Sequence, residues 1–246
     1  MTLKKTLLAL IIISFTTSAF GEDECFEKAS RAIFKFNEGL DRTIIAPVAK
    51  GYNKLPEPIK KGTGNFTSNI ATLLSIPNQL LQGNIEGAGH SLGSFMINTS
   101  IGILGLADVA SSLGVKDTKE DLSQTLGVYG VKGGCYFVIP VLGPSTVRDA
   151  SGSIVSILGG DPWYNVSVKN DTQYFNEQDY YISRGTAGVD FRAKNIESFD
   201  NLEENAMDFY ASVKSLYLQD RKQKILNSKG VVDTMNDSDW EEIEEK

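Results

Sequence analysis

Few side chains in this chain of 246 residues could carry out covalent chemistry, and their arrangement argues against it. The one histidine, His90, lies on the polar side of an expected helix, so a Ser–His–acid triad lacks a well-placed base. Ser145 occurs in the sequence G-P-S-T, and the G-x-S-x-G pattern of a nucleophile at a strand–helix turn is missing. A helix N-cap explains Ser145 more simply. We therefore predict that the chain is not an enzyme.

The sequence also gives no pattern for a metal or a cofactor. Two cysteines and one histidine cannot supply a zinc cluster. Glu120 and Asp121 could bind calcium weakly, but no loop of the EF-hand type surrounds them. The glycine-rich stretches 102–105 and 127–134 lack the G-x-x-x-x-G-K-[ST] pattern of a phosphate loop. We predict neither a metal site nor a cofactor.

Composition places the chain among ordinary globular proteins, with 41% hydrophobic and 22% charged residues. A net charge of −7 makes nucleic acid an unexpected partner, because a phosphate-binding face needs clustered Lys and Arg. The basic clusters at 60–61 and 221–224 are short.

Residues 1–21 have the pattern of a cleaved signal peptide, with Lys4 and Lys5 before an apolar run and Ala19 and Gly21 at the cleavage site. An uncleaved anchor is the alternative. We expect export, and no N-terminal lipidation, because Cys25 does not directly follow the apolar run. In an oxidising compartment Cys25 and Cys135 could form a disulfide, although two buried free thiols would fit the sequence equally.

The elements that must position any site are mainly short amphipathic helices. Pro47 and Pro77 are expected to end helices, and the only strand signal lies near 136–141. The acidic tail, 231–246, is expected to be disordered. Helices are expected at 26–45, 65–74, 84–100, 108–113, 117–126, 145–158, 177–202 and 205–226.

Many short amphipathic helices without a spanning segment fit a protein that lies in a membrane interface. A soluble, irregular all-α domain gives the same pattern, so the residues alone leave both open.

Several runs together resemble the MlaA (VacJ) family over about residues 24–222. The most specific is P-V-L-G-P-S-T-V-R-D at 140–149, within the glycine- and proline-rich stretch 124–149. Further runs are F-K-F-N at 34–37, G-L-A-D-V-A at 105–110, Q-T-L-G at 124–127, D-F-Y at 208–210 and Y-L-Q at 217–219.

The resemblance implies a ring of short helices with one hairpin-like segment, lying in the inner leaflet of the outer membrane, as a single domain over 22–230. It implies a phospholipid-translocating role that maintains lipid asymmetry, with a trimeric porin and a soluble periplasmic lipid carrier as partners. A soluble periplasmic carrier or adaptor is the alternative function, and a lipid-modifying enzyme is a third that lacks a nucleophile.

The resemblance also supplies candidate sites. The glycine-rich span 127–134 and the apolar run after it could form a gate, or equally a static hairpin. Candidates for the lipid pathway or gate are Asn65, Phe66, Gly133, Gly134, Tyr136 and Phe137. The signature residues are Pro140, Gly143, Pro144, Ser145, Thr146, Arg148 and Asp149.

Two departures from the family pattern involve the cysteines. Cys25 and Cys135 both stand where the family commonly has proline. The hypothesis that follows is a disulfide that joins the N-terminus to the central stretch.

Overall fold

The computed structural model describes residues 25–156, 158, 161–165, 168 and 176–228. The predicted signal peptide, 1–21, and the predicted disordered tail, 231–246, lie outside the described residues.

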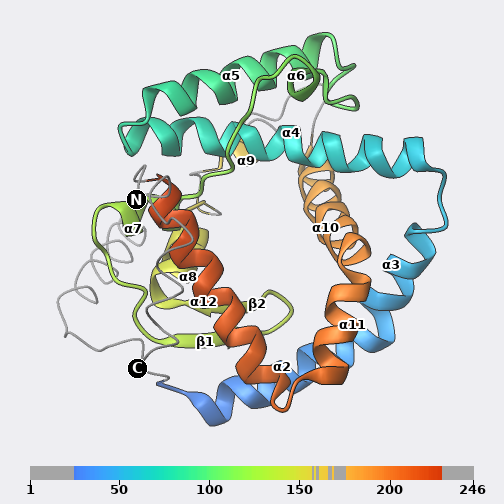
Figure 1. Ribbon diagram of the computed structural model, residues 1–246, viewed down its shortest axis with the longest axis vertical. Helices are drawn as coiled ribbons and strands as arrows, with labels where there is room; N and C mark the ends of the chain where they lie inside the picture. Colours follow the sequence, from blue (N-terminus) through green and yellow to red (C-terminus); the bar gives the residue numbers. More distant parts are fainter. Residues whose placement is uncertain (1–24, 157, 159–160, 166–167, 169–175, 229–246) are drawn as a thin grey trace, which may run out of the picture.

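The described helices follow one another around a ring, and one β-hairpin lies on its inner side (Figure 1). The two strands form a two-stranded antiparallel sheet. This confirms the predicted fold class, which is mainly α with one short hairpin. In order, the elements are α2 (Glu27–Leu40), η1 (Asp41–Ile45), α3 (Ala46–Tyr52), α4 (Glu57–Leu81), α5 (Ile85–Ser100), α6 (Val109–Ser112), α7 (Leu122–Val128), β1 (Tyr136–Ile139), β2 (Gly143–Thr146), α8 (Val147–Val155), α9 (Pro162–Tyr164), α10 (Glu177–Lys194), α11 (Ile196–Asn205) and α12 (Phe209–Ser228).

Two prolines do not end helices, contrary to the prediction. Pro47 lies in the first turn of α3, directly after the π-helical turn η1, which relieves the usual proline clash with the preceding carbonyl. Pro77 lies inside α4, which runs for 25 residues and includes residues 57–64, which lie outside the helices expected from the sequence. A helix supported by tertiary packing can therefore absorb the loss of one backbone hydrogen bond.

Local capping signals were more reliable. Asn84 caps α5 by accepting a hydrogen bond from the Gly87 amide at 2.8 Å. Asp108 caps α6, within the helix expected at 108–113, and accepts from the amide of Ser111 at 3.1 Å. The long helix predicted over 177–202 is interrupted, because Asn195 leaves helical geometry between α10 and α11.

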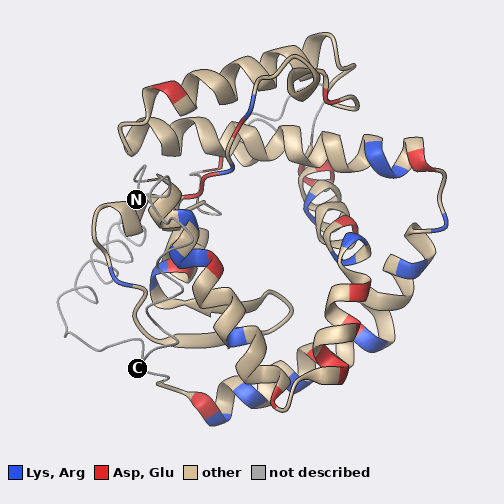
Figure 2. Cartoon of the chain, viewed as in Figure 1, with Lys and Arg blue, Asp and Glu red and all other residues tan. Residues whose placement is uncertain are grey.

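The antiparallel pair α4 and α5 has polar residues inside and apolar residues outside. Gln79 and Ser91 are fully buried and Thr72 is 1% exposed, whereas Met96 is 61% exposed. Figure 2 shows few charged residues along α5 and the later turns of α4. The exposed apolar side chains of this pair and the segment that follows are Ile59, Leu80, Leu81, Ile85, Leu92, Met96, Ile101, Ile103, Leu104, Leu106 and Leu113.

Aromatic residues form the core that joins the hairpin to the ring. Tyr136 of β1 is 1% exposed and packs against Tyr210 of α12, with ring centres 6.1 Å apart. Phe34 of α2 contacts Tyr210 edge to face at 5.4 Å. The core therefore connects α2, β1 and α12.

Ion pairs connect helices that are distant in sequence. Arg31 of α2 contacts Asp208, just before α12, at 2.9 Å, and Arg42 of η1 pairs with Glu203 of α11. Arg192 Nη2 of α10 lies 2.9 Å from Asp41 Oδ2 of η1. These contacts hold the α10–α12 arc against the α2–η1 arc in Figure 1. Within the described part of the chain, no helix combines the length and apolar character needed to cross a membrane.

Candidate functional site at the hairpin and the last helix

The hairpin contains most of the predicted signature residues. Tyr136 pairs with Thr146, and Ile139 pairs with Gly143. The turn needs positive φ at Gly143, which glycine adopts freely, and at Val141 (φ 69°), where a β-branched residue is strained. Asn37 of α2 holds this turn, because its amide donates to the Ile139 carbonyl at 2.9 Å and accepts from the Val141 amide at 2.8 Å.

The serine predicted as a helix cap lies one residue too early. Ser145 belongs to β2, and its hydroxyl donates to the Thr146 carbonyl at 3.3 Å. Thr146 caps α8 instead, because it ends the strand in extended geometry and its Oγ1 accepts from the Asp149 amide at 3.2 Å. Ser145 therefore pairs in the hairpin, and α8 begins one residue later than the sequence indicated.

A disulfide lies at the base of the hairpin. Cys25 and Cys135 are bonded, with their Cα atoms 5.5 Å apart. Backbone pairing continues beyond the two strands on the side away from the turn. The Val147 amide donates to the Cys135 carbonyl at 3.1 Å, and the Arg148 amide donates to the Gly133 carbonyl at 3.0 Å. The chain before α2 is thus attached directly to the hairpin stem.

Asp149 is the centre of a buried charge cluster. Its side chain accepts hydrogen bonds from Arg148 Nε and Nη2, both at 3.0 Å, and from Arg221 Nη2 at 3.2 Å. The hydroxyl of Tyr217 donates to its other oxygen at 2.6 Å. Arg221 also forms two hydrogen bonds with the carboxylate of Asp121, at 2.7 and 3.0 Å. The cluster connects α7, α8 and α12 through charge-assisted bonds.

The environment sets the ionisation of this cluster. Burial alone raises the pKa of Asp149, but Arg221, Tyr217 and Arg148 outweigh it, so this pKa lies below its ordinary value. Burial, followed by the bond to Asp149, raises the pKa of Tyr217 well above its ordinary value. Burial lowers the pKa of Arg221, but Asp121 and Asp149 raise it by more, so this pKa lies above its ordinary value. Asp149 is therefore ionised and both partners remain protonated at neutral pH.

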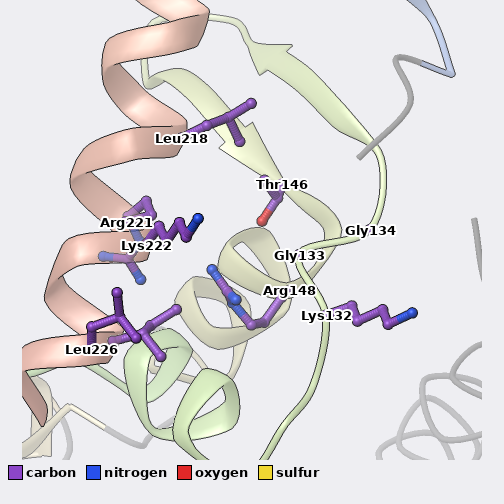
Figure 3. A pocket seen from close by; sticks show the side chains of 10 residues that line it. Lys132, Gly133, Gly134, Thr146, Arg148, Leu218, Arg221, Lys222 and Leu226 are labelled. Atoms are coloured by element: carbon purple, nitrogen blue, oxygen red, sulfur yellow. The ribbon is translucent and has the colours of Figure 1, made fainter. Parts of the chain in front are cut away.

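A cavity of about 410 Å³ adjoins this cluster, between α12, the start of α8 and residues 132–134 (Figure 3). In Figure 3, Arg221 and Lys222 extend from α12 and Arg148 extends toward them from α8, whereas Lys132 points away. Gly133 and Gly134 form the opposite wall, and Leu218, Ile225 and Leu226 make the α12 side apolar.

Residues 22–224 match the family model described as MlaA lipoprotein. The chain belongs to the MlaA lipoprotein family. It is 30% identical over 240 residues to the intermembrane phospholipid transport system lipoprotein MlaA of Haemophilus influenzae, covering 92% of each chain. It is 29% identical over 255 residues to the protein of that name in Escherichia coli K12, covering 96% of each. An uncharacterized protein of Rickettsia bellii is 33% identical over 202 residues, which cover 81% of this chain and 76% of that protein.

A solved structure described as "Structural basis for maintenance of bacterial outer membrane lipid asymmetry" has the same fold. Its TM-score is 0.69 at 28% sequence identity, and the match covers 82% of this chain and 99% of that one. The MlaA family is a transport lipoprotein family and not a known enzyme family.

The pathway candidates implied by the MlaA resemblance do not lie together. Asn65 of α4 donates to the Leu106 carbonyl at 3.0 Å. Phe66 lines a separate cavity of about 220 Å³ beside Trp163 and α10. Gly133 and Gly134 line the larger cavity, Tyr136 lies in the core, and Phe137 is half-buried on the other face of β1.

Three residues of this MlaA-family site were missing from the sequence-based candidates: Tyr217, Arg221 and Lys222. They lie about 70 residues after the signature run, and only folding brings Tyr217 and Arg221 to Asp149 and Lys222 to the adjoining cavity. The signal that could have found them is the basic cluster at 221–224, which we considered only for nucleic acid.

The two adjacent glycines of the stem should respond differently to alanine. Gly134 has φ 72°, and an added Cβ would lie 3.3 Å from Val147 Cβ, so Gly134→Ala should lower the free energy of unfolding by about 1–2 kcal/mol. A Cβ on Gly133 would meet Thr146 at an ordinary 3.6 Å, so Gly133→Ala should change stability by less than about 0.5 kcal/mol. Urea unfolding of both variants measures the difference, and equal losses would contradict this account of the stem.

Proposed function

We propose that this chain is a phospholipid-translocating component of an intermembrane transport system, which removes mislocalised phospholipid from the outer membrane and so maintains its lipid asymmetry. Its relatives in Haemophilus influenzae and Escherichia coli are named as lipoproteins of an intermembrane phospholipid transport system. The observation that carries the proposal for this chain is the apolar exterior of α4 and α5. A protein in water normally turns such side chains inward, and a contiguous exposed set marks a contact with membrane or protein.

The polar interior of the same pair fits this placement. In a lipid leaflet the apolar side chains contact acyl chains, while polar groups are satisfied within the protein. The side-chain amide of Asn69 donates to Thr99 at 2.9 Å, and that of Gln79 donates to the Thr118 carbonyl at 3.1 Å, whereas the side-chain oxygens of both residues accept no hydrogen bond among the described residues. We infer that the ring lies in the periplasmic leaflet of the outer membrane with α4 and α5 among the lipid tails.

A porin and a soluble periplasmic lipid carrier are the partners that we propose from the family resemblance. A soluble carrier or adaptor is the second function that we propose. Without N-terminal lipidation, which we predict to be absent, the helices would have to attach the chain to the membrane. Fractionation separates the two: protein retained in outer membranes after salt and carbonate washing supports the embedded component, and complete release supports the carrier.

The apolar exterior gives a direct test of membrane contact. Met96→Glu should reduce partition into phospholipid vesicles at least tenfold, because it replaces an exposed apolar side chain by a charge that is costly to place in lipid. Its effect on the free energy of unfolding should stay below about 0.5 kcal/mol, since the side chain is exposed. Vesicle flotation measures the partition.

The matched control for Met96→Glu is Gln223→Glu, which adds the same charge to an exposed position of α12. It should partition as the unmodified chain does. If both variants float equally well, α4 and α5 do not contact the lipid.

A further inference from the structure

We propose that the cavity between α12, α8 and residues 132–134 binds the phosphate of an anionic phospholipid headgroup. This inference rests on the proposed function and adds to it a location and a class of lipid. The larger cavity has both chemistries that such a ligand needs, namely fixed cations and an apolar wall.

The two arginines of the cavity are held in place before any ligand arrives. Arg148 is 7% exposed, and its Nε and Nη2 are held by Asp149. Its remaining terminal nitrogen, Nη1, makes only a long bond of 3.4 Å to the Val131 carbonyl. A guanidinium that is fixed by a carboxylate on one edge can present its other edge to a phosphate without losing further side-chain freedom.

Arg221 also has donor capacity left. Its two terminal nitrogens bind Asp121 and Asp149, but its buried Nε donates to no acceptor among the described residues. An unsatisfied buried donor is costly, and a phosphate oxygen in the adjoining cavity would supply an acceptor after a small rotation of the side chain.

The charge balance favours an anion over a zwitterion. Two carboxylates, Asp121 and Asp149, offset the two arginines. Lys222 then adds positive charge, as does Lys132, whose side chain points away, and neither lysine has an ion-pair partner in the described part of the chain. Both carboxylates are already engaged, so the ammonium of a zwitterionic headgroup would find no free acid here. The phosphate of phosphatidylglycerol would add a negative charge and no positive one.

The apolar wall favours a lipid over a free phosphate ion. Leu218, Ile225 and Leu226 border the same space as the cations. They would contact the glycerol and first methylene groups of a phospholipid, and inorganic phosphate has nothing to place against them.

The test measures binding of short-chain lipid to the full chain in detergent, by calorimetry below the micelle concentration of the lipid. Dihexanoylphosphatidylglycerol should bind several-fold more tightly than dihexanoylphosphatidylcholine and at least tenfold more tightly than inorganic phosphate. Lys222→Gln should weaken binding of the phosphatidylglycerol about five- to tenfold, because it removes one charge-assisted contact. Lys222 is the residue of choice, since no ion pair of the cluster depends on it.

Lys224→Gln is the matched control. Lys224 lies on the same helix, is exposed and pairs with Asp220 at 2.7 Å, so its loss should leave lipid binding unchanged. The urea midpoints of both variants should equal that of the unmodified chain, which excludes misfolding as a cause.

Three results would overturn the inference: a Lys222→Gln variant that binds as the unmodified chain does, equal affinity for the two lipids, or inorganic phosphate binding as tightly as lipid. The proposed function is assessed separately, by lipid transfer between reconstituted membranes. If lipid transfer continues although the cavity binds no lipid, the proposed binding site is wrong and the proposed function still holds.

Discussion

Asp149→Asn should lower the free energy of unfolding by about 3–5 kcal/mol, the largest effect that we expect from a single substitution. The change is nearly isosteric, but it removes the charge that offsets Arg148 and part of Arg221, and the side chain is only 7% exposed. Removing one partner of a buried ion pair leaves the other charge uncompensated, which destabilises the folded state by about 3–5 kcal/mol. Urea unfolding followed by circular dichroism measures the loss.

The pH dependence of the same variant provides a second measurement. The folded-state pKa of Asp149 lies below its ordinary value, so its stabilising contribution is complete above about pH 4 and is lost as the pH falls further. The gap between the unmodified chain and Asp149→Asn should therefore narrow below about pH 4.

Asp220→Asn serves as the control for both measurements. Its exposed pair with Lys224 should contribute less than about 0.5 kcal/mol at any pH. Equal losses for Asp149→Asn and Asp220→Asn would show that the cluster does not stabilise the fold.

Removing the disulfide should have an effect of similar size. The bond joins residues that are 110 positions apart, and closing a loop of that length in the unfolded chain corresponds to about 4–5 kcal/mol in the chain-entropy model. The Cys25→Ser/Cys135→Ser double variant should therefore unfold at a lower urea concentration. A reducing agent should shift the unmodified chain toward the double variant.

The double variant is itself the control, because a reducing agent should not change its stability. Peptide mapping without reduction should recover one peptide pair that contains Cys25 and Cys135. Two free thiols in the folded chain, or unmodified stability after complete reduction, would contradict the structure at this point.

The sequence predicted the features that depend on neighbouring residues. The positions of α5 and α6 followed from patterns within four residues. Pro47 and Pro77 were misjudged, because a proline ends a helix only where packing and a local π-helical turn do not compensate for it. The placement of the helix cap at Ser145 failed for a similar reason, since strand pairing determined where α8 begins.

The sequence predicted only some of the residues of the candidate site. The resemblance identified Arg148 and Asp149, but it did not connect them with Tyr217 or Arg221, whose contacts form only in the folded ring. Amphipathic spacing also predicted α5, but it did not indicate that the apolar side chains of this helix point outward. The spacing of apolar residues is the same whether they face the protein core or the exterior.

Two kinds of contact that help to close the ring respond differently to ionic strength. The Cys25–Cys135 junction is covalent and does not depend on dissolved ions. Arg31 with Asp208 and Arg42 with Glu203 are pairs with substantial solvent exposure, so their attraction weakens as the Debye length falls from about 10 Å at 0.1 M to about 3 Å at 1 M salt. Concentrated salt therefore weakens these ion pairs between the α10–α12 arc and the α2–η1 arc, while the hairpin stays attached to the N-terminal chain.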